Sequence, residues 1–312
     1  MTDRIVPVAA AIVTRPDGRV LVAQRPAGKA FAGYWEFPGG KLEAGEAPRD
    51  ALIRELAEEL GLKVRRAAPW LVQRFTYPHA DVELHFFRVY EWDGEPVGHD
   101  GQAFAWQVPG AFDVAPLLPA NTLVLRALTL PLVCGITMAG DMGEAAFLAR
   151  ARIALERGLR LIQLREKDWP VMRQHALCEA LLELARPFGA RVLLNGSEEN
   201  ARAWGCAGVH WTSAALAEAI ARPSDLICSA SCHTREEIAK SGALNLDFAL
   251  LGPVAPTPTH QGAIALQWDG FAAVAAGASL PVFALGGLVR SDLENAIDHG
   301  AHGIALRRAA WS

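Results

Sequence analysis

The chain lacks three features that are typical of membrane proteins, nucleic-acid-binding proteins and secreted proteins. No apolar run reaches the ~18–20 residues that a membrane-spanning helix needs. A net charge of −4 gives no positive excess for binding a nucleic acid polymer. The five cysteines form no C-x-x-C pair and are odd in number, which favours reduced, buried thiols. We therefore expect a cytoplasmic protein with neither a membrane nor a nucleic acid polymer as its partner.

The length and the rhythm of the sequence predict two domains, 1–130 and 131–312. The chain has 312 residues, of which 51% are hydrophobic, enough for two cores. Up to about residue 130, strands mix with few helices, which is typical of an α+β domain. Its strands are expected at 6–14, 20–25, 73–77, 82–92 and 102–108, the first two as a hairpin around Asp17-Gly18.

The second part alternates short apolar strands with helical stretches, which predicts a (β/α)8 barrel of the TIM type. The eight expected strands are 132–136, 161–165, 192–195, 208–210, 226–231, 248–252, 282–285 and 303–306. About six residues follow the last strand, so the barrel should lack its last helix. The open side would need cover from the other domain or from a second subunit, as in a homodimer. Active sites of such barrels lie at the carboxyl ends of the strands.

Residues 40–62 carry the strongest chemical signal in the chain. Pro48 suits a first helical turn and Gly61 suits the residue after a helix, so a helix is expected between them. Glu55, Glu58 and Glu59 then lie at i, i+3 and i+4 and present three carboxylates on one ridge. A hard divalent cation such as Mg2+ would compensate their repulsion. The alternative is a solvated acidic face with Arg54 as an ion-pair partner.

The spacing from Gly40 to Leu62 fills G-x5-E-x7-R-E-U-x-E-E-x-G-U, where U is a bulky aliphatic residue, and resembles the Nudix box. Runs at 35–41, 91–96 and 118–121 resemble the MutT type of Nudix hydrolase. The resemblance implies an α+β Nudix fold and hydrolysis of a nucleoside triphosphate to monophosphate and pyrophosphate. The expected substrate is a small-molecule nucleotide, 8-oxo-dGTP, and the expected cofactor is Mg2+, for which Mn2+ would substitute.

By position, the resemblance also assigns roles to individual residues. The metal ligands would be Glu55, Glu58, Glu59, the backbone carbonyl of Gly39 and a distal acid, Asp100. The alternative for Asp100 is an ordinary turn residue with no role in metal binding. Arg54 would orient the carboxylates, and Glu46 would tie down the preceding loop. Lys41 would contact phosphate or serve as an exposed structural lysine.

Three residues match positions that line the base pocket in that family. Arg25 and Phe37 are two of them, although Phe37 would equally suit the core. Asn121 offers a donor and an acceptor that would bind the edge of a purine, or it would cap the following helix. Ala80 stands where the relatives carry an arginine that closes on the nucleotide. A competing hypothesis is hydrolysis of a thiamine-related pyrophosphate, which would unify the two halves of the chain metabolically.

The barrel resembles the thiamine-phosphate synthase superfamily, including the TenI-like tautomerases, through runs at 163–168, 208–210, 231–233, 252–257 and 286–287. The metal-binding acids of the synthases are absent, since Asn195-Gly196 and Trp211-Thr212-Ser213 stand in their place, and His260 replaces a lysine. Synthase chemistry would therefore lack its charge stabilisation.

What remains in the barrel suits proton transfer. The resemblance implies His233 as an acid and base, with Arg165, Asn195, Gly286 and Gly287 binding the substrate. Arg307-Arg308 replace small residues of the family and would either bind phosphate or block its site. A barrel that is a non-catalytic interaction module is the alternative.

Overall fold

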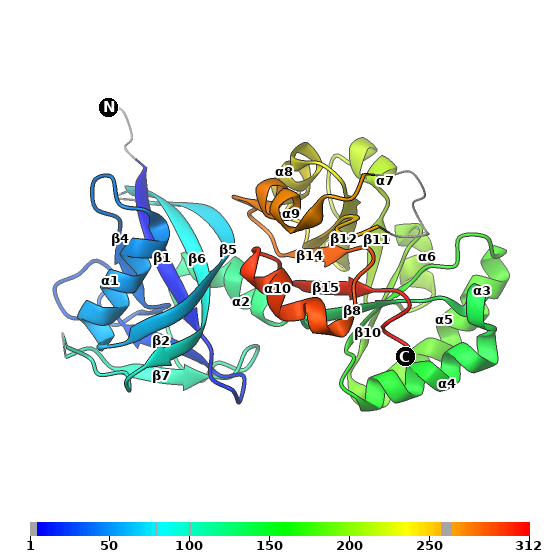
Figure 1. Cartoon of the computed structure of the whole chain (residues 1–312), viewed down its shortest axis with the longest axis horizontal. Coiled ribbons are helices and arrows are strands. Elements are labelled where there is room, and N and C mark those ends of the chain that lie inside the picture. The colour runs from blue at the N-terminus through cyan, green and yellow to red at the C-terminus, as the bar shows by residue number, and fades with distance from the viewer. Residues whose placement is uncertain (1–4, 79, 100, 257–263) are drawn as a thin grey trace. The chain divides into compact units, whose positions relative to one another are not determined.

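The computed structural model describes residues 5–78, 80–99, 101–256 and 264–312. The chain divides into two compact units, Met1–Thr129 and Leu130–Ser312, drawn from blue to green and from green to red in Figure 1. Within the described ranges, no helix has both the length and the apolar character that crossing a bilayer requires.

The first unit has an α+β fold built on two sheets, as expected. The larger sheet has the order β4-β1-β6-β5 and the smaller has the order β3-β2-β7. The strands are β1 Val6–Val13, β2 Val20–Gln24, β3 Trp35–Glu36, β4 Gly39–Lys41, β5 Lys63–Tyr77, β6 Ala80–Asp93 and β7 Phe104–Gln107. The helices are α1 Pro48–Leu60 and α2 Thr122–Leu128, the latter preceded by a 3-10 turn, η1 Pro119–Asn121.

Strand β1 is apolar at both alternations because both of its faces are covered. Ala9, Ala11 and Val13 pack in one cluster with the leucines of α1, Leu52, Leu56 and Leu60. Ala10 and Ile12 pack in a second cluster with Phe37, Phe86 and Val124, the last from α2. Successive side chains of a strand point to opposite faces, so β1 places α1 on one side of the sheet and α2 on the other.

The predicted hairpin between the first two strands is wrong. Thr14 and Val20 form a single antiparallel bridge beside the Asp17-Gly18 turn, and the two strands then enter different sheets. A strand has two hydrogen-bonding edges. β6 takes one edge of β1 in parallel, and β4 pairs with Val8–Ala10 on the other edge, whereas β2 lies between β3 and β7 in the smaller sheet.

The second unit is a closed barrel of eight parallel strands in the order β10-β11-β12-β13-β14-β15-β8-β9, which confirms the predicted fold. Its strands are β8 Val133–Ile136, β9 Leu161–Leu164, β10 Arg191–Leu194, β11 Gly208–Trp211, β12 Ile227–Cys232, β13 Phe248–Leu251, β14 Val282–Leu285 and β15 Gly303–Leu306. Its helices are α3 Ala139–Met142, α4 Glu144–Glu156, α5 Val171–Ala185, α6 Glu198–Ala203, α7 Ser213–Glu218, α8 Arg235–Ala243, α9 Gln267–Ala275 and α10 Leu293–Asp298.

The residues after β15, from Arg307 to Ser312, contain no helix, as the sequence predicts. The indole of Trp311 is buried there instead. It donates a hydrogen bond to the carbonyl of Ile136 at 2.9 Å and packs edge-to-face on Phe147 of α4. A side chain at Gly135 of β8 would meet this ring at 3.0 Å. Trp311 thus packs against β8 and α4.

Candidate functional site

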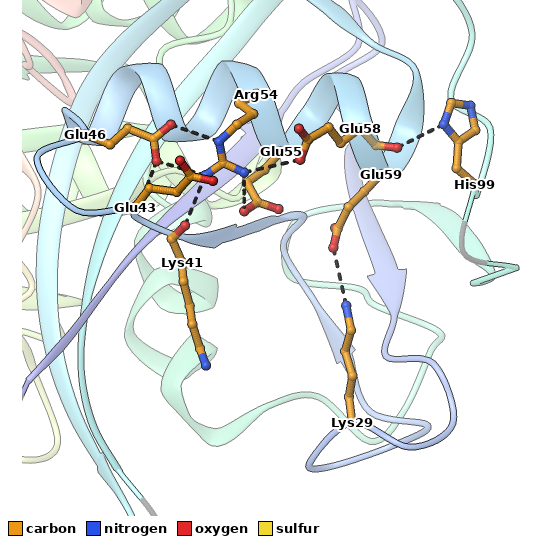
Figure 2. Close-up of polar contacts among 9 residues, drawn as sticks. All are labelled: Lys29, Lys41, Glu43, Glu46, Arg54, Glu55, Glu58, Glu59 and His99. Atoms are coloured by element: carbon orange, nitrogen blue, oxygen red, sulfur yellow. Dashed lines mark hydrogen bonds and ion pairs between the residues drawn. The ribbon is translucent and has the colours of Figure 1, made fainter.

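Helix α1 positions the acidic ridge that the sequence predicts. Pro48 opens the helix, and Gly61 ends it in the left-handed conformation at φ 64°, with its N–H on the carbonyl of Ala57. The buried leucines hold the opposite face of α1 against the sheet. The carboxylates of Glu55, Glu58 and Glu59 therefore remain outside the core (Figure 2).

Arg54 joins this ridge to the loop that precedes α1. Its guanidinium donates to both carboxylate oxygens of Glu46 at 2.9 and 2.8 Å, to Glu55 at 2.9 Å and to Glu58 at 3.3 Å (Figure 2). It also reaches the carbonyl of Lys41 at 3.2 Å. Glu46 accepts the backbone N–H of Glu43 at 2.8 Å, and the hydrogen bonds from Arg54 hold the pKa of Glu46 down at about 2. The result is a charged clamp between the helix and the loop.

The last turn of α1 is held by two other segments. The ammonium of Lys29 lies 3.5 Å from the carboxylate of Glu59. His99 donates its backbone N–H to the carbonyl of Glu59 at 3.1 Å, and its ring nitrogen Nδ1 lies 2.9 Å from the carbonyl of Glu58. The predicted distal acid, Asp100, lies outside the described residues, so its place in the site stays a prediction.

Two glycines bring backbone directly to the ridge. A Cβ atom at Gly40 would lie 2.1 Å from Cδ of Glu55, and one at Gly39 would lie 2.1 Å from the backbone oxygen of Ala9. The carboxylate of Glu55 thus occupies the space that a side chain at position 40 would take. The adjoining Lys41 is exposed, and its side chain points away from the ridge (Figure 2).

The donor set of the ridge suits a divalent cation. Carboxylate oxygens are hard ligands of the kind that Mg2+ and Mn2+ prefer. Among the described residues, however, no three His, Cys, Asp or Glu side chains converge as a metal cluster. The reason is visible in the ion pairs, because Arg54 and Lys29 engage the acids that would bind the ion. The chemistry of the residues fits the cation, although their side chains point to cationic partners.

The three predicted base-pocket residues differ in their surroundings. Arg25 donates to the two carboxylate oxygens of Glu36 at 2.7 and 2.6 Å and to the carbonyl of Ala30 at 2.7 Å. Phe37 is buried and packs edge-to-face on Phe86, as a core residue would. Asn121 is only 3% exposed. It precedes α2 without capping it through its side chain, and its Nδ2 has no hydrogen-bond partner among the described residues.

Sequence reasoning missed Glu36 and Tyr77 beside this group. Burial raises the pKa of Glu36, although the charge of Arg25 lowers it. Burial also raises the pKa of Tyr77, and the charge of Glu36 raises it further. Glu36 pairs in register with Ala23 of β2, next to the strand end that leads to Arg25. The signal was available, since Glu36 lies inside the run 35–41 that indicated the MutT type.

In the barrel, all five predicted binding and catalytic residues line one cavity of about 530 Å3. They are Arg165, Asn195, His233, Gly286 and Gly287, which follow strands β9, β10, β12 and β14. Asn195 donates to the carbonyl of His210 at 3.0 Å, and Nδ1 of His233 lies 2.7 Å from the carbonyl of Gly252. Arg307 and Arg308, which the sequence predicts either to bind phosphate or to block its site, also line this cavity. His260 lies outside the described residues.

His210 should remain neutral far below the usual pH range of histidine. Burial, reinforced by Arg165 and Lys167, lowers its pKa to about 3, and its two ring nitrogens lie 2.8 Å from the hydroxyls of Ser229 and Ser231. In the unfolded chain, His210 has the ordinary histidine pKa of 6.5. Stability from this residue is therefore complete above 6.5 and is lost as the pH falls through about 3. Nitrogen NMR should show a neutral ring at pH 5, whereas a midpoint near 6.5 would contradict this environment.

The five cysteines are all buried free thiols, as the sequence predicts. Burial raises the pKa of Cys134 to about 12 and that of Cys232 to about 11. Such thiols serve as small core residues.

Comparisons with known proteins divide the chain in the same way as its structure. A NUDIX domain model matches residues 4–125, and a thiamine monophosphate synthase model (TMP-TENI) matches residues 133–310. An 8-oxo-dGTP diphosphatase of Haemophilus influenzae is 40% identical over 128 residues, covering 41% of this chain and 94% of the relative. A CTP pyrophosphohydrolase of Escherichia coli is 39% identical over 124 residues, covering 40% of this chain and 91% of the relative.

The second unit has its own relatives. A putative thiamine-phosphate synthase of Geobacter sulfurreducens is 37% identical over 175 residues, covering 55% of this chain and 82% of the relative. The chain therefore belongs to the Nudix family through residues 4–125 and to the thiamine monophosphate synthase family through residues 133–310.

Proposed function

We propose that the first unit is a pyrophosphohydrolase of 8-oxo-dGTP, which it converts to 8-oxo-dGMP and pyrophosphate with Mg2+ as its cofactor. The observation that carries the proposal is the arrangement around α1. Arg54 clamps Glu46, Glu55 and Glu58 together, and Glu55 lies against the side-chain-free backbone of Gly40. Similarity to an 8-oxo-dGTP diphosphatase supports the choice of substrate.

Each part of this arrangement has a chemical task in the proposal. Glu55, Glu58, Glu59 and the backbone carbonyl of Gly39 would hold the divalent ion, with Asp100 as a further acid. When bound, the ion neutralises phosphate charge and lowers the pKa of the attacking water. Arg54 holds the carboxylates of Glu55 and Glu58 near each other, and both would turn from Arg54 toward the ion when the ion and the substrate bind.

Lys29 would contact the phosphates of the substrate. It reaches the ridge from the loop between β2 and β3 and pairs with Glu59 at 3.5 Å. An ammonium on the rim of this ridge provides a cation for the polyphosphate of the substrate. The pairing with Glu59 balances part of the ridge's negative charge.

The buried amide of Asn121 supports a purine as the base that this pocket would bind. A buried N–H donor without a partner costs roughly 1–3 kcal/mol, and the oxygen at C6 of a guanine would accept its hydrogen bond. Arg25 and Glu36 lie as a paired donor and acceptor that would bind further polar atoms of a base. Ala80 leaves the site without the arginine of the relatives, so Asn121 would carry a larger share of recognition.

Asn121→Ala should raise KM for 8-oxo-dGTP about tenfold while kcat changes little, which corresponds to losing one hydrogen bond of roughly 1.4 kcal/mol. Steady-state kinetics of the full chain with Mg2+ would measure this effect. Thr122→Ala at the start of α2 controls for disturbance of the helix. Parallel assays with CTP and thiamine diphosphate discriminate the competing substrates. An unchanged KM for 8-oxo-dGTP, or faster turnover of thiamine diphosphate, would contradict the assignment.

A further inference from the structure

Two of the five buried cysteines lie in contact, although 28 positions separate them in the chain. The sulfur atoms of Cys178 and Cys206 are 3.3 Å apart. A disulfide holds its two sulfurs about 2 Å apart, so small side-chain rotations that bring them roughly 1 Å closer would allow a bond. The fold therefore places two thiols where they can be joined.

Neighbouring segments hold this pair in place. Cys178 lies on the buried face of α5, and Cys206 lies in the turn between α6 and β11. One turn earlier on α5, the ring of His175 stacks on Trp204, with 5.0 Å between the ring centroids. The backbone N–H of Cys206 donates to the carbonyl of Ala201 at 2.9 Å. Residues i and i+3 share a helix face, so two contacts along one face of α5 fix the position of this turn.

The two thiols differ in acidity and in exposure. As the donor, the S–H of Cys178 lowers the pKa of Cys206, although burial opposes the change. The same hydrogen bond raises the pKa of Cys178, and burial raises it further. Cys206 is 6% exposed, whereas Cys178 is fully buried. The thiolate is the reactive form of cysteine, so Cys206 is the thiol that would react first.

The other three cysteines lack this arrangement. Burial raises the pKa of Cys134 and that of Cys228 to about 12. Cys232 lies 3.4 Å from the hydroxyl of Ser241, which is not a partner for oxidation. Buried thiols with a raised pKa are inert, so these three cysteines serve as internal controls.

We propose that Cys178 and Cys206 form a reversible disulfide, which stabilises the barrel, when a peroxide oxidises the chain. The sulfur of Cys206 attacks the O–O bond of the peroxide and becomes a sulfenic acid, while the other oxygen leaves as an alcohol, or as water from hydrogen peroxide. The sulfur of Cys178 then displaces the hydroxyl of the sulfenic acid as water and forms the S–S bond. The two thiols lose two electrons and two protons, and the peroxide takes up both.

The cross-link would act on stability and not on the barrel cavity. Cys206 precedes β11, so it lies toward the amino end of that strand, whereas the cavity lies at the carboxyl ends. A disulfide between positions 178 and 206 closes a loop of the chain and restricts its unfolded state. Oxidation should therefore raise the melting temperature of the barrel by about 5 °C.

Thiol mapping of the full chain tests this inference. The reduced chain is treated with hydrogen peroxide, quenched with catalase, unfolded and alkylated. We expect two of the five thiols to be lost, and peptide mass spectrometry should find Cys178 joined to Cys206. Calorimetry of the folded, oxidised chain should show the higher barrel melting temperature, and dithiothreitol should reverse both changes.

Variants separate the two steps. Cys178→Ser should stop at a sulfenic acid on Cys206, which dimedone traps, and Cys206→Ser should keep its remaining thiols reduced. Cys134→Ala is the matched control and should still lose two thiols. The peptide map of the parent chain remains decisive if a variant does not fold. The inference is overturned by five intact thiols after peroxide, by a disulfide that involves another cysteine or another chain, by oxidation of Cys134 or Cys228 ahead of Cys206, or by an unchanged melting temperature.

Discussion

Glu58→Gln should lower kcat for 8-oxo-dGTP about a hundredfold or more, the size of effect seen when one preorganised electrostatic contact to a reacting group is lost. Glutamine keeps the shape of the side chain but removes the negative charge that would bind the ion. Glu58 is largely exposed, at 62% of its side chain, so the substitution should leave the fold intact. Steady-state rates at saturating nucleotide and Mg2+ would measure the loss.

Asp50→Asn is the matched control for this experiment. Asp50 is an exposed acid in the first turn of the same helix and lies off the ridge. Its variant should keep kcat within about twofold of the parent chain, because surface charges away from a site have small effects. If Glu58→Gln also stayed within that range, Glu58 would not be a metal ligand.

Gly40→Ala should abolish most turnover while leaving the fold nearly as stable as before. The new Cβ would lie 2.1 Å from Cδ of Glu55, which is the movable end of a side chain. Glu55 can relieve the collision by turning away, so the substitution should impair turnover and not the stability of the fold. We expect kcat to fall about as far as in a variant that removes a contact to the reacting group, on the order of a hundredfold.

Two comparisons make the cause of this loss visible. In a Glu55→Gln background, Gly40→Ala should lower kcat only slightly further. Both changes remove the same carboxylate from the site, so their effects on kcat are not additive. Gly39→Ala is the structural contrast, since its Cβ would meet the backbone oxygen of Ala9, which cannot rotate away. That variant should lower the free energy of unfolding. Additive losses in the Gly40 and Glu55 variants would contradict the steric account.

Local patterns predicted the helix and the barrel strands well. The box helix was expected between Pro48 and Gly61, and α1 occupies Pro48–Leu60 because proline and glycine act on the backbone where they stand. The eight barrel strands appear within a residue or two of their expected positions. A short, continuously apolar run between helical stretches is typical of a parallel strand that is buried on both faces. Cavity-lining residues followed from the rule that they lie at strand ends.

What sequence reasoning missed depends on contacts between distant segments. The pairing of β1 with β4 and β6 joins residues about 30 and 75 positions apart, and no local turn signal indicates it. The ion pair between Lys29 and Glu59 and the approach of Arg307 to Arg165 depend on tertiary placement in the same way. Glu36 was overlooked because its partner belongs to another strand. Arg25 comes directly after β2, and Glu36 lies in the neighbouring strand β3.

We propose that the α1 carboxylates bind a divalent cation, and electron paramagnetic resonance of Mn2+ measures that binding. The free-ion signal should fall as the full chain is added, and the Glu55→Gln/Glu58→Gln/Glu59→Gln variant should lose that effect while Asp50→Asn keeps it. Binding of Mn2+ to the triple variant with the parent affinity would contradict the account.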